Sequence, residues 1–350
     1  MDRASAGLTV AAASRPLLPE APAIHEIRRA VRAWLTEYDA TTVVVGLSGG
    51  ADSAALTAAA VAEAAAVHAV VVDHRLQAGS DMVAARAVEF AESVGCASAR
   101  VQVVDVSGPG GLEAAARHAR YRALDAARCG NPVLLGHTLD DQAETVLLGL
   151  GRGSGLRSIR GMAPFDGPWG RPLLGVRRDT TRLACEELGY RPYEDPHNSD
   201  PRFTRVRLRS EVLPLLEDVL GGGAAVALAR TAAQLREDGE VLDEAAARML
   251  ADALATPDTP TGPQQLDTAT LASAPPAVRR RAVRAWLIGM GASSPPDRTL
   301  RAVDALVGEW HGQGPVAVGR GPERGTRLVV ARRRGRLSVE FVDQQRCADD

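Results

Sequence analysis

The sequence predicts an α/β protein built on a doubly wound parallel sheet, with a smaller and mainly helical C-terminal domain. The first observation is an alternation of short apolar segments with longer helical ones. Strands are expected at residues 42–47, 67–73, 99–104 and 132–136, and helices between them at residues 53–65, 81–94 and 112–129. Such alternation specifies parallel strands covered by helices on both faces. The second observation is the glycine run at residues 221–223, which precedes a long amphipathic segment and marks a domain boundary.

The other elements follow in chain order. A chain of 350 residues is too long for one compact core. We therefore expect a disordered tail at residues 1–22, a first domain at 23–220, and a second at 221–350 that begins with a long connecting helix. Apolar residues at helical spacing from Ile24 to Leu35 predict the first helix. Residues 151–172 and 190–204 are expected to be irregular, and 255–263 a linker; further helices are expected at 179–188, 205–216, 224–254, 276–288 and 297–307, and short strands near 316, 328 and 337.

The composition is that of an ordinary globular protein, with 45% hydrophobic and 24% charged residues. A formal net charge of -2 argues against a globally basic nucleic-acid binder, so any RNA contact must come from local patches. The four cysteines lie far apart, without a pair spaced for zinc, and fit reduced, mostly buried thiols of a cytoplasmic protein. Glu63 and His68 interrupt the apolar stretch at residues 54–72, so no membrane contact is expected.

A glycine-serine turn follows the first expected strand and opens the next helix. Its sequence is Ser48-Gly49-Gly50-Ala51-Asp52-Ser53. Gly49 and Gly50 lack Cβ atoms, so the backbone can turn tightly and present N–H groups to an anion beside the positive end of the helix dipole. A Walker A loop requires a lysine, and all 41 cationic residues of this chain are arginine. The sequence therefore predicts a phosphate-binding loop of another type.

Two further strand ends carry polar residues. Asp73 and His74 lie at the end of the second expected strand. Taken alone, these polar residues indicate only that the strand ends in a loop. Because a phosphate loop is expected beside them, we interpret them as contacts with a nucleotide. His137 follows the fourth expected strand. We expect His137 and Asp141, four residues apart, to lie on one face of a helix and to act in catalysis. The alternative is helix capping by Thr138 with acidic residues in the first turn.

The turn at residues 48–53 matches the S-G-G-x-D-S signature of the PP-loop ATP pyrophosphatases, which cleave ATP between its α- and β-phosphates. Later segments narrow the resemblance to the family of tRNA(Ile)-lysidine synthases. They are V-D-H-R-L at 72–76, G-H-x-x-D-D-Q-A-E-T at 136–145, R-G-S-G-L at 152–156, R-P-L-L at 171–174 and D-P-H-N-S-D at 195–200. The match runs in order from about residue 43 to 216. His197 and Val206 depart from the family's usual residues, which affects the hydrogen bonding of that loop but not the enzyme class.

The resemblance implies that free L-lysine is joined to C2 of the wobble cytidine in tRNA(Ile) with a CAU anticodon, through an adenylated base, with release of AMP and pyrophosphate. It implies catalytic roles for Asp52, His137 and Asp141, with Asp52 holding Mg²⁺. Lysine binding is implied at Asp141 and Glu144, and tRNA binding at Arg152, Arg205 and Arg207. Contacts with ATP are implied at Ser48, Gly49, Gly50, Ala51, Asp52, Ser53, Asp73, His74 and Gly136.

Two other functions stay open at this stage. Another PP-loop enzyme that modifies tRNA by 2-thiolation is the nearest alternative, although such enzymes generally rely on paired or catalytic cysteines that this chain does not show. A nucleotide-binding protein without turnover is the alternative from a different class, and it would release no pyrophosphate. The sequence also leaves the oligomeric state open, a homodimer included.

Overall fold

The computed structural model describes residues 18–107, 111–153, 155–255, 264–320 and 326–343. The chain forms two compact units that divide within helix α10 (Ala224–Ala253), after Ala232. The first unit holds residues up to 153 and 158–232, and the second holds 154–157 and 233 onward. The expected tail lies outside the described residues up to residue 17, as does the expected linker at 256–263.

A six-stranded sheet forms the middle of the first unit, in the order β3-β2-β1-β4-β6-β5. Neighbouring strands are parallel except β5, which runs antiparallel to β6 at the edge. The predicted parallel sheet is confirmed, and β5 and β6 lie in a segment that was expected to be irregular. The strands are β1 (Thr42–Gly46), β2 (Ala66–Asp73), β3 (Ser98–Val103), β4 (Val133–Leu134), β5 (Phe165–Asp166) and β6 (Trp169–Gly170).

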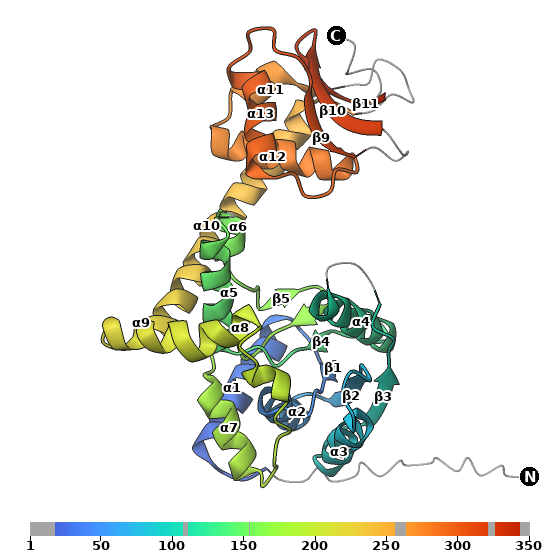
Figure 1. Cartoon of the computed structure of the whole chain (residues 1–350), viewed down its shortest axis with the longest axis vertical. Coiled ribbons are helices and arrows are strands. Elements are labelled where there is room, and N and C mark those ends of the chain that lie inside the picture. Colours follow the sequence, from blue (N-terminus) through green and yellow to red (C-terminus); the bar gives the residue numbers. More distant parts are fainter. Residues whose placement is uncertain (1–17, 108–110, 154, 256–263, 321–325, 344–350) are drawn as a thin grey trace, which may run out of the picture. The chain divides into compact units, whose positions relative to one another are not determined.

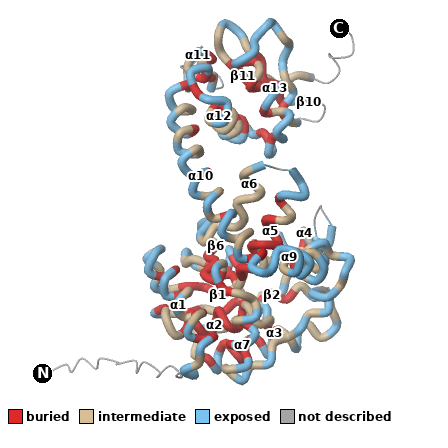
Figure 2. Tube along the Cα trace, turned by 90° about the vertical axis from the view of Figure 1, so that its left-hand side faces the viewer, coloured by how far each residue is buried: buried red, intermediate tan, exposed pale blue. Residues whose placement is uncertain are grey.

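Helices cover both faces of this sheet (Figure 1). Successive side chains of a strand point to opposite faces, so Val43 and Val45 of β1 enter one apolar core while Val44 enters another. The second core also contains Leu124 of helix α4. Figure 2 shows that buried stretches concentrate along β1 and α2. The first core packs the sheet against α1 (Pro22–Glu37), α2 (Ala51–Glu63), α3 (Ser80–Ser93) and α7 (Arg178–Glu187), and the second against α4 (Leu112–Ala127).

The segment expected as a helix at residues 205–216 contains a π-helical turn, Leu208–Val212, between two short α-helices. Turns of this type are frequent at functional sites. Among the described residues, no single helix is long and apolar enough to cross a membrane. The helices Thr204–Val219 and Ala224–Ala253 meet the length and composition criteria only when they are counted together, and the chain is sharply bent between them. The helices of this part are α5 (Leu139–Gly151), α6 (Leu156–Ile159), a 3-10 turn (Pro196–Ser199), α8 (Thr204–Arg207), α9 (Leu213–Val219) and α10 (Ala224–Ala253).

The second unit combines helices with a five-stranded antiparallel sheet in the order β7-β8-β11-β10-β9. Arg334 and Gly335 join β10 to β11 with positive φ angles of 49° and 76°, as two-residue hairpin turns require. The helices expected at 276–288 and 297–307 are confirmed. The elements are β7 (Leu254–Ala255), β8 (Gln265–Asp267), α11 (Thr268–Ala272), α12 (Pro276–Gly289), α13 (Asp297–Gly308), β9 (Val316–Arg320), β10 (Thr326–Arg333) and β11 (Arg336–Asp343).

Gly170 in β6 lies where the packing leaves no room for a side chain. A Cβ atom there would lie 2.7 Å from Leu134 Cδ2 and closer still to the ring of Trp34, whose indole N–H donates to the Pro164 carbonyl at 2.9 Å. We expect Gly170→Ala to lower the Tm, because overpacking costs roughly 1–3 kcal/mol. Thermal unfolding followed by circular dichroism measures the effect. The control Gly175→Ala, with no neighbouring atom within 4 Å, should leave the Tm unchanged; equal Tm values for both variants would contradict this packing.

Candidate active site

The phosphate loop connects β1 to α2 and is organised by the hydroxyl of Ser53. Ser53 Oγ accepts from the Ser48 N–H at 3.1 Å and donates to the Gly50 carbonyl at 3.0 Å. Gly49 takes a φ of +80°, which favours glycine. No side chain caps the first N–H groups of α2, so they are free to bind an anion. The loop therefore has the geometry that the sequence predicts.

Gly136 brings the end of β4 directly against this loop. A Cβ atom on Gly136 would lie 2.9 Å from the carbonyl carbon and oxygen of Asp52 and from the N atom of Ser53. Only glycine permits such an approach. The residues that follow Gly136 are thereby held beside the first turn of α2.

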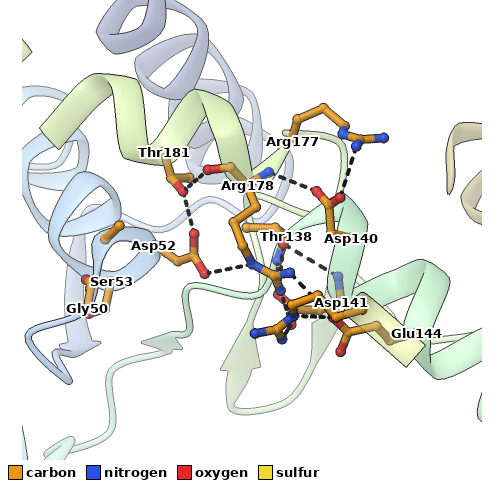
Figure 3. A network of polar contacts seen from close by, with 12 residues as sticks. Gly50, Asp52, Ser53, Thr138, Asp140, Asp141, Glu144, Arg177, Arg178 and Thr181 are labelled. Atoms are coloured by element: carbon orange, nitrogen blue, oxygen red, sulfur yellow. Dashed lines mark hydrogen bonds and ion pairs between the residues drawn. The ribbon is translucent and has the colours of Figure 1, made fainter. Parts of the chain in front are cut away.

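Asp52 points away from the loop toward α7 (Figure 3). Its carboxylate accepts a short hydrogen bond from the Thr181 hydroxyl, and its other oxygen lies 3.6 Å from Arg178 Nε. The pKa of Asp52 is raised, because burial disfavours the carboxylate more than Thr181 and Arg178 favour it. Ionised Asp52 is therefore short of positive partners, as expected of a group that binds a cation.

Arg178 links Asp52 to the acidic residues of α5 (Figure 3). Its guanidinium lies 2.7 Å from Asp141 Oδ1 and 3.4 Å from Glu144 Oε1. Its backbone N–H donates to Asp140 Oδ2 at 2.8 Å. One arginine at the start of α7 thus joins α2 to α5, a contact that sequence spacing does not reveal.

Glu144 is completely buried and surrounded by arginines. Arg209 Nε lies 2.8 Å from Glu144 Oε1, and Arg205 Nη1 lies 3.5 Å from Oε2, in addition to Arg178. Arg205 belongs to α8 and Arg209 to the π turn that follows it, and both side chains reach Glu144 of α5. The sequence contains this arginine repeat, but the pattern suggested contacts with RNA and gave no sign of a buried carboxylate beneath it.

Asp141 caps helix α5, so the capping alternative is confirmed for this residue. The Thr138 N–H donates to Asp141 Oδ2 at 2.8 Å, and the Asp141 N–H donates to Thr138 Oγ1 at 3.4 Å. Burial would raise the pKa of Asp141, but the charge of Arg178 and the hydrogen bonds from Thr138 lower it. Asp141 is therefore held as a carboxylate beside the loop.

His137 does not lie on the helix that carries Asp141, and this expectation is wrong. Helix α5 begins at Leu139 with Thr138 as its N-cap, so His137 still belongs to the connection from β4. Burial lowers the pKa of His137 to about 3, helped by Arg120 and Arg171 and opposed by Asp141. The imidazole is consequently neutral at physiological pH.

Asp73 and His74 lie at the end of β2, as predicted. Asp73 is 6% exposed, and its Oδ1 accepts from the Arg75 N–H at 2.9 Å, which closes the turn after the strand. Burial and the charge of Arg120 lower the pKa of His74, against the attraction of Asp73. The structure therefore brings His74 and His137 to the same sheet edge, on either side of the phosphate loop.

The three arginines expected to bind tRNA have different surroundings. Arg205 is tied to Glu144, as described above. Arg207 is exposed and pairs with Glu211 at 2.8 Å. Arg152 is exposed and caps the end of α5. Two of the three are therefore accessible to a large partner in the described structure.

No metal centre formed by protein groups alone is found among the described residues, where no group of three or more His, Cys, Asp or Glu side chains lies close enough to hold an ion. The cysteines described, Cys96, Cys129 and Cys185, are unpaired, and Cys129 is exposed although the sequence suggested mostly buried thiols. The described part of the chain thus shows no disulfide.

Comparisons with known proteins cover both units. A PP-loop domain model matches residues 23–216, and a TilS substrate binding domain model matches residues 266–338. The chain is 63% identical to the tRNA(Ile)-lysidine synthase of Rhodococcus erythropolis, over 94% of this chain and 99% of that protein. It is 65% identical to the tRNA(Ile)-lysidine synthase of Nocardia farcinica, over 89% and 97%. The U34-tRNA thiolase NcsA of Methanococcus maripaludis, solved with its 4Fe-4S cluster, shares the fold with a TM-score of 0.51 and 20% identity, over 61% of this chain and 80% of that one.

The opposite pKa shifts of Asp52 and Asp141 predict opposite effects of neutralising them. Above the unfolded pKa of about 4, ionised Asp52 costs stability and ionised Asp141 adds it. Asp52→Asn should therefore raise the Tm at pH 7, and Asp141→Asn should lower the stability by roughly 3–5 kcal/mol. The stability gained by the Asp52 variant should vanish as the pH falls through the raised pKa of Asp52. The stability lost by the Asp141 variant should persist to lower pH, because the pKa of Asp141 is lowered.

Denaturation curves at a series of pH values measure both effects. The exposed residue Asp166 offers a control, since Asp166→Asn should change the Tm little at any pH. A lower Tm for the Asp52 variant at pH 7 would show that its carboxylate is adequately paired, contrary to the geometry.

Proposed function

The chain belongs to the tRNA(Ile)-lysidine synthase family, and we propose that it joins free L-lysine to C2 of the wobble cytidine of tRNA(Ile) with a CAU anticodon, as a cytoplasmic ligase. ATP is cleaved to AMP and pyrophosphate, and the base is adenylated on the C2 oxygen before the lysine ε-amine displaces AMP. The observation that supports this proposal best is that the phosphate loop and a cluster of carboxylates lie together at one edge of the sheet. The phosphate loop carries Asp52, and Arg178 connects Asp52 to the carboxylates of Asp141 and Glu144.

We assign ATP to the loop of residues 48–53, with Asp73, His74 and Gly136 beside it. The uncapped N–H groups of α2 and the hydroxyls of Ser48 and Ser53 would stabilise the departing pyrophosphate. Mg²⁺ fits the donor set, because it often takes one or two carboxylates and completes its shell with phosphate oxygens and water. Asp52 would hold it, and the bound ion would neutralise charge on the polyphosphate.

We assign the lysine ammonium to the carboxylates of Asp141 and Glu144. Both already accept hydrogen bonds from arginines, so the ammonium must displace a guanidinium. Arg205 is the one best placed to leave Glu144: its side chain is 42% exposed, against 34% for Arg209 and 11% for Arg178, and its contact is the longest of the three at 3.5 Å. Lysine entry would thereby release Arg205 toward a phosphate of the tRNA.

His137 and Asp141 act in this proposal without titrating. The neutral imidazole of His137 can donate one hydrogen bond to an oxygen of the adenylated base or of its phosphate, but it is not a general acid at neutral pH. The lowered pKa of Asp141 suits electrostatic orientation of the ammonium. Phosphate contacts at Arg152, Arg205 and Arg207 and in the second unit would hold the tRNA while the cytidine is turned out of its stack.

The reaction products test the proposal. With ATP, lysine and CAU-anticodon tRNA(Ile), the chain should release AMP and pyrophosphate, and mass analysis should find lysine on the anticodon nucleoside. Asp52→Ala should abolish turnover because the metal-binding carboxylate is lost, while Asp166→Ala should retain it. Release of ADP and orthophosphate, or sulfur in place of lysine, would contradict this function.

The arginine run at residues 332–334 predicts a second test, because the structure divides it. Arg332 Nη1 donates to the carbonyls of Leu306 and Val307 at 2.8 and 3.4 Å, so it fixes the end of α13. Arg333 and Arg334 are exposed. The double variant Arg333→Gln, Arg334→Gln should weaken tRNA binding. The slope of the logarithm of the binding constant against the logarithm of the salt concentration should become shallower by about 1 for each phosphate contact that is lost. Arg332→Gln should instead lower the Tm.

Filter binding of tRNA at several salt concentrations measures the slope. An unchanged slope in the double variant would move the phosphate contacts away from this hairpin. Arg301→Gln is a suitable control, since Arg301 forms an exposed pair with Asp297 on α13.

A further inference from the structure

Four buried nitrogen atoms near the carboxyl edge of the first sheet have no hydrogen-bond partner among the described residues. They are His74 Nδ1, Arg120 Nε, His137 Nδ1 and Arg171 Nε. Buried polar atoms are nearly always satisfied, so a group of unsatisfied ones indicates a missing partner. None of the four atoms belongs to the acidic cluster around Arg178.

Helix α4 carries Arg120 to this edge. Leu124 of α4 lies beside Gly46 and Leu135, since the side chains of both leucines come within 3.3 Å of a Cβ placed on Gly46. A helix that connects parallel strands runs antiparallel to them, so its earlier residues lie nearer their carboxyl ends. Arg120 is four residues before Leu124, on the same helix face and about 6 Å closer to that edge.

Tyr121, the next residue of α4, shows which strands Arg120 lies nearest. The ring of Tyr121 packs edge-on against Trp169 of β6, with centroids 4.5 Å apart. Arg171 follows Trp169 by two residues, and its Nη1 donates to the Ala163 carbonyl at 3.0 Å while its Nε is unsatisfied. Arg120 is thus held between the ends of β2 and β4, where it acts electrostatically on both His74 and His137.

Positive charge at this place is not balanced by the carboxylates around it. Among the described residues Arg120 forms no ion pair, and its guanidinium carbon lies 5.5 Å from the centre of the Tyr121 ring. Burial lowers the pKa of Arg120, against the effect of Tyr121. Asp73 accepts from the Arg75 backbone, and Asp141 is held by Arg178. Arg120 is half-buried, but its Nε is fully enclosed and has no partner. Leaving this nitrogen unpaired is costly, so the site is suited to an anion that arrives with a ligand.

We propose that Arg120 and His137, each with a buried nitrogen that lacks a partner, bind the α-phosphoryl group of ATP and of AMP. The proposal rests on the proposed function only in placing the adenosine over the end of β2 and the pyrophosphate on the phosphate loop after β1. The α-phosphate must lie between them, at the sheet edge where the charge of Arg120 acts on His74 and His137. A planar guanidinium suits a phosphoryl group whose charge is spread over several oxygens.

Binding experiments on the full chain test this assignment without turnover. In Arg120→Gln, the Kd for AMP measured by calorimetry should rise about 10- to 100-fold, while the Kd for pyrophosphate should change less than about threefold. Arg122→Gln, at an exposed position of the same helix, should leave both values unchanged.

A stability measurement separates ligand binding from a structural role. Arg120→Met removes an uncompensated buried charge, so it should raise the Tm of the ligand-free chain and reduce the Tm increase given by AMP. A lower Tm together with unchanged AMP affinity would show that Arg120 supports the fold, and would overturn the proposal.

The lysine α-carboxylate is the other oxyanion that could occupy this pocket. A Kd for lysine that rises in Arg120→Gln while the Kd for AMP is unchanged would identify it and overturn the phosphoryl assignment. Wild-type chain that binds no AMP would also overturn it. AMP binding is measured without tRNA. A loss of AMP affinity in Arg120→Gln would therefore support the phosphoryl assignment even if the chain formed no lysidine.

Discussion

The buried carboxylate of Glu144 is the constraint on which the rest of the active site depends. Removing one partner from a buried ion pair typically costs about 3–5 kcal/mol, because the other charge is left without compensation. Glu144 is fully buried and holds Arg178, Arg205 and Arg209, so α5, α7 and the π turn must come together for any of these charges to be paired. Arg178 then has the position from which it reaches Asp141 and Asp52. A single carboxylate thus holds together side chains from separate segments of the candidate site.

The two sides of the phosphate loop have opposite electrostatic character. Asp52, Asp141 and Glu144 give one side its carboxylates, while on the other side the charges of Arg120 and Arg171 help to keep His137 neutral. The acidic side is suited to a metal ion and an ammonium, and the basic side to an oxyanion. Asp52 and Arg120 each lack part of the counter-charge that burial demands. Binding of a cation at Asp52 and of an oxyanion at Arg120 would relieve this cost, a common relation between stability and function.

Local pattern predicted the scaffold well because its elements obey local rules. The valine-rich strands β1 and β2, the alanine-rich α2 and the phosphate loop between them follow from side-chain type and glycine placement. Strands β5 and β6 were missed, because two residues each are too few to show an alternating pattern. They depend on tertiary contacts such as that of Gly170 with Trp34.

Residues in the candidate site were predictable where they belong to a motif and hidden where they act at long range. Spacing placed His137 on a helix, yet Thr138 starts that helix one residue later, since its hydroxyl and Asp141 form a capping box. Arg178 and Arg120 have no special sequence context. Their roles arise because α7 and α4 approach the same sheet edge from opposite faces, which depends on the whole fold.

The sequence contains no lysine, so all the permanently charged cationic side chains around the site are of one chemical kind. Every fixed side-chain cation is a guanidinium, which is planar and weakly hydrated and stays protonated when buried. These groups can hold carboxylates and phosphates in fixed orientations without releasing protons. A primary ammonium has a different shape and three donors directed to a tetrahedron. At carboxylates shaped by arginine forks, the lysine of the proposed reaction would be distinguished by geometry from every side-chain cation of the chain. The ammonium of a free lysine, unlike a guanidinium, can also lose a proton and become the nucleophile that the proposed reaction needs.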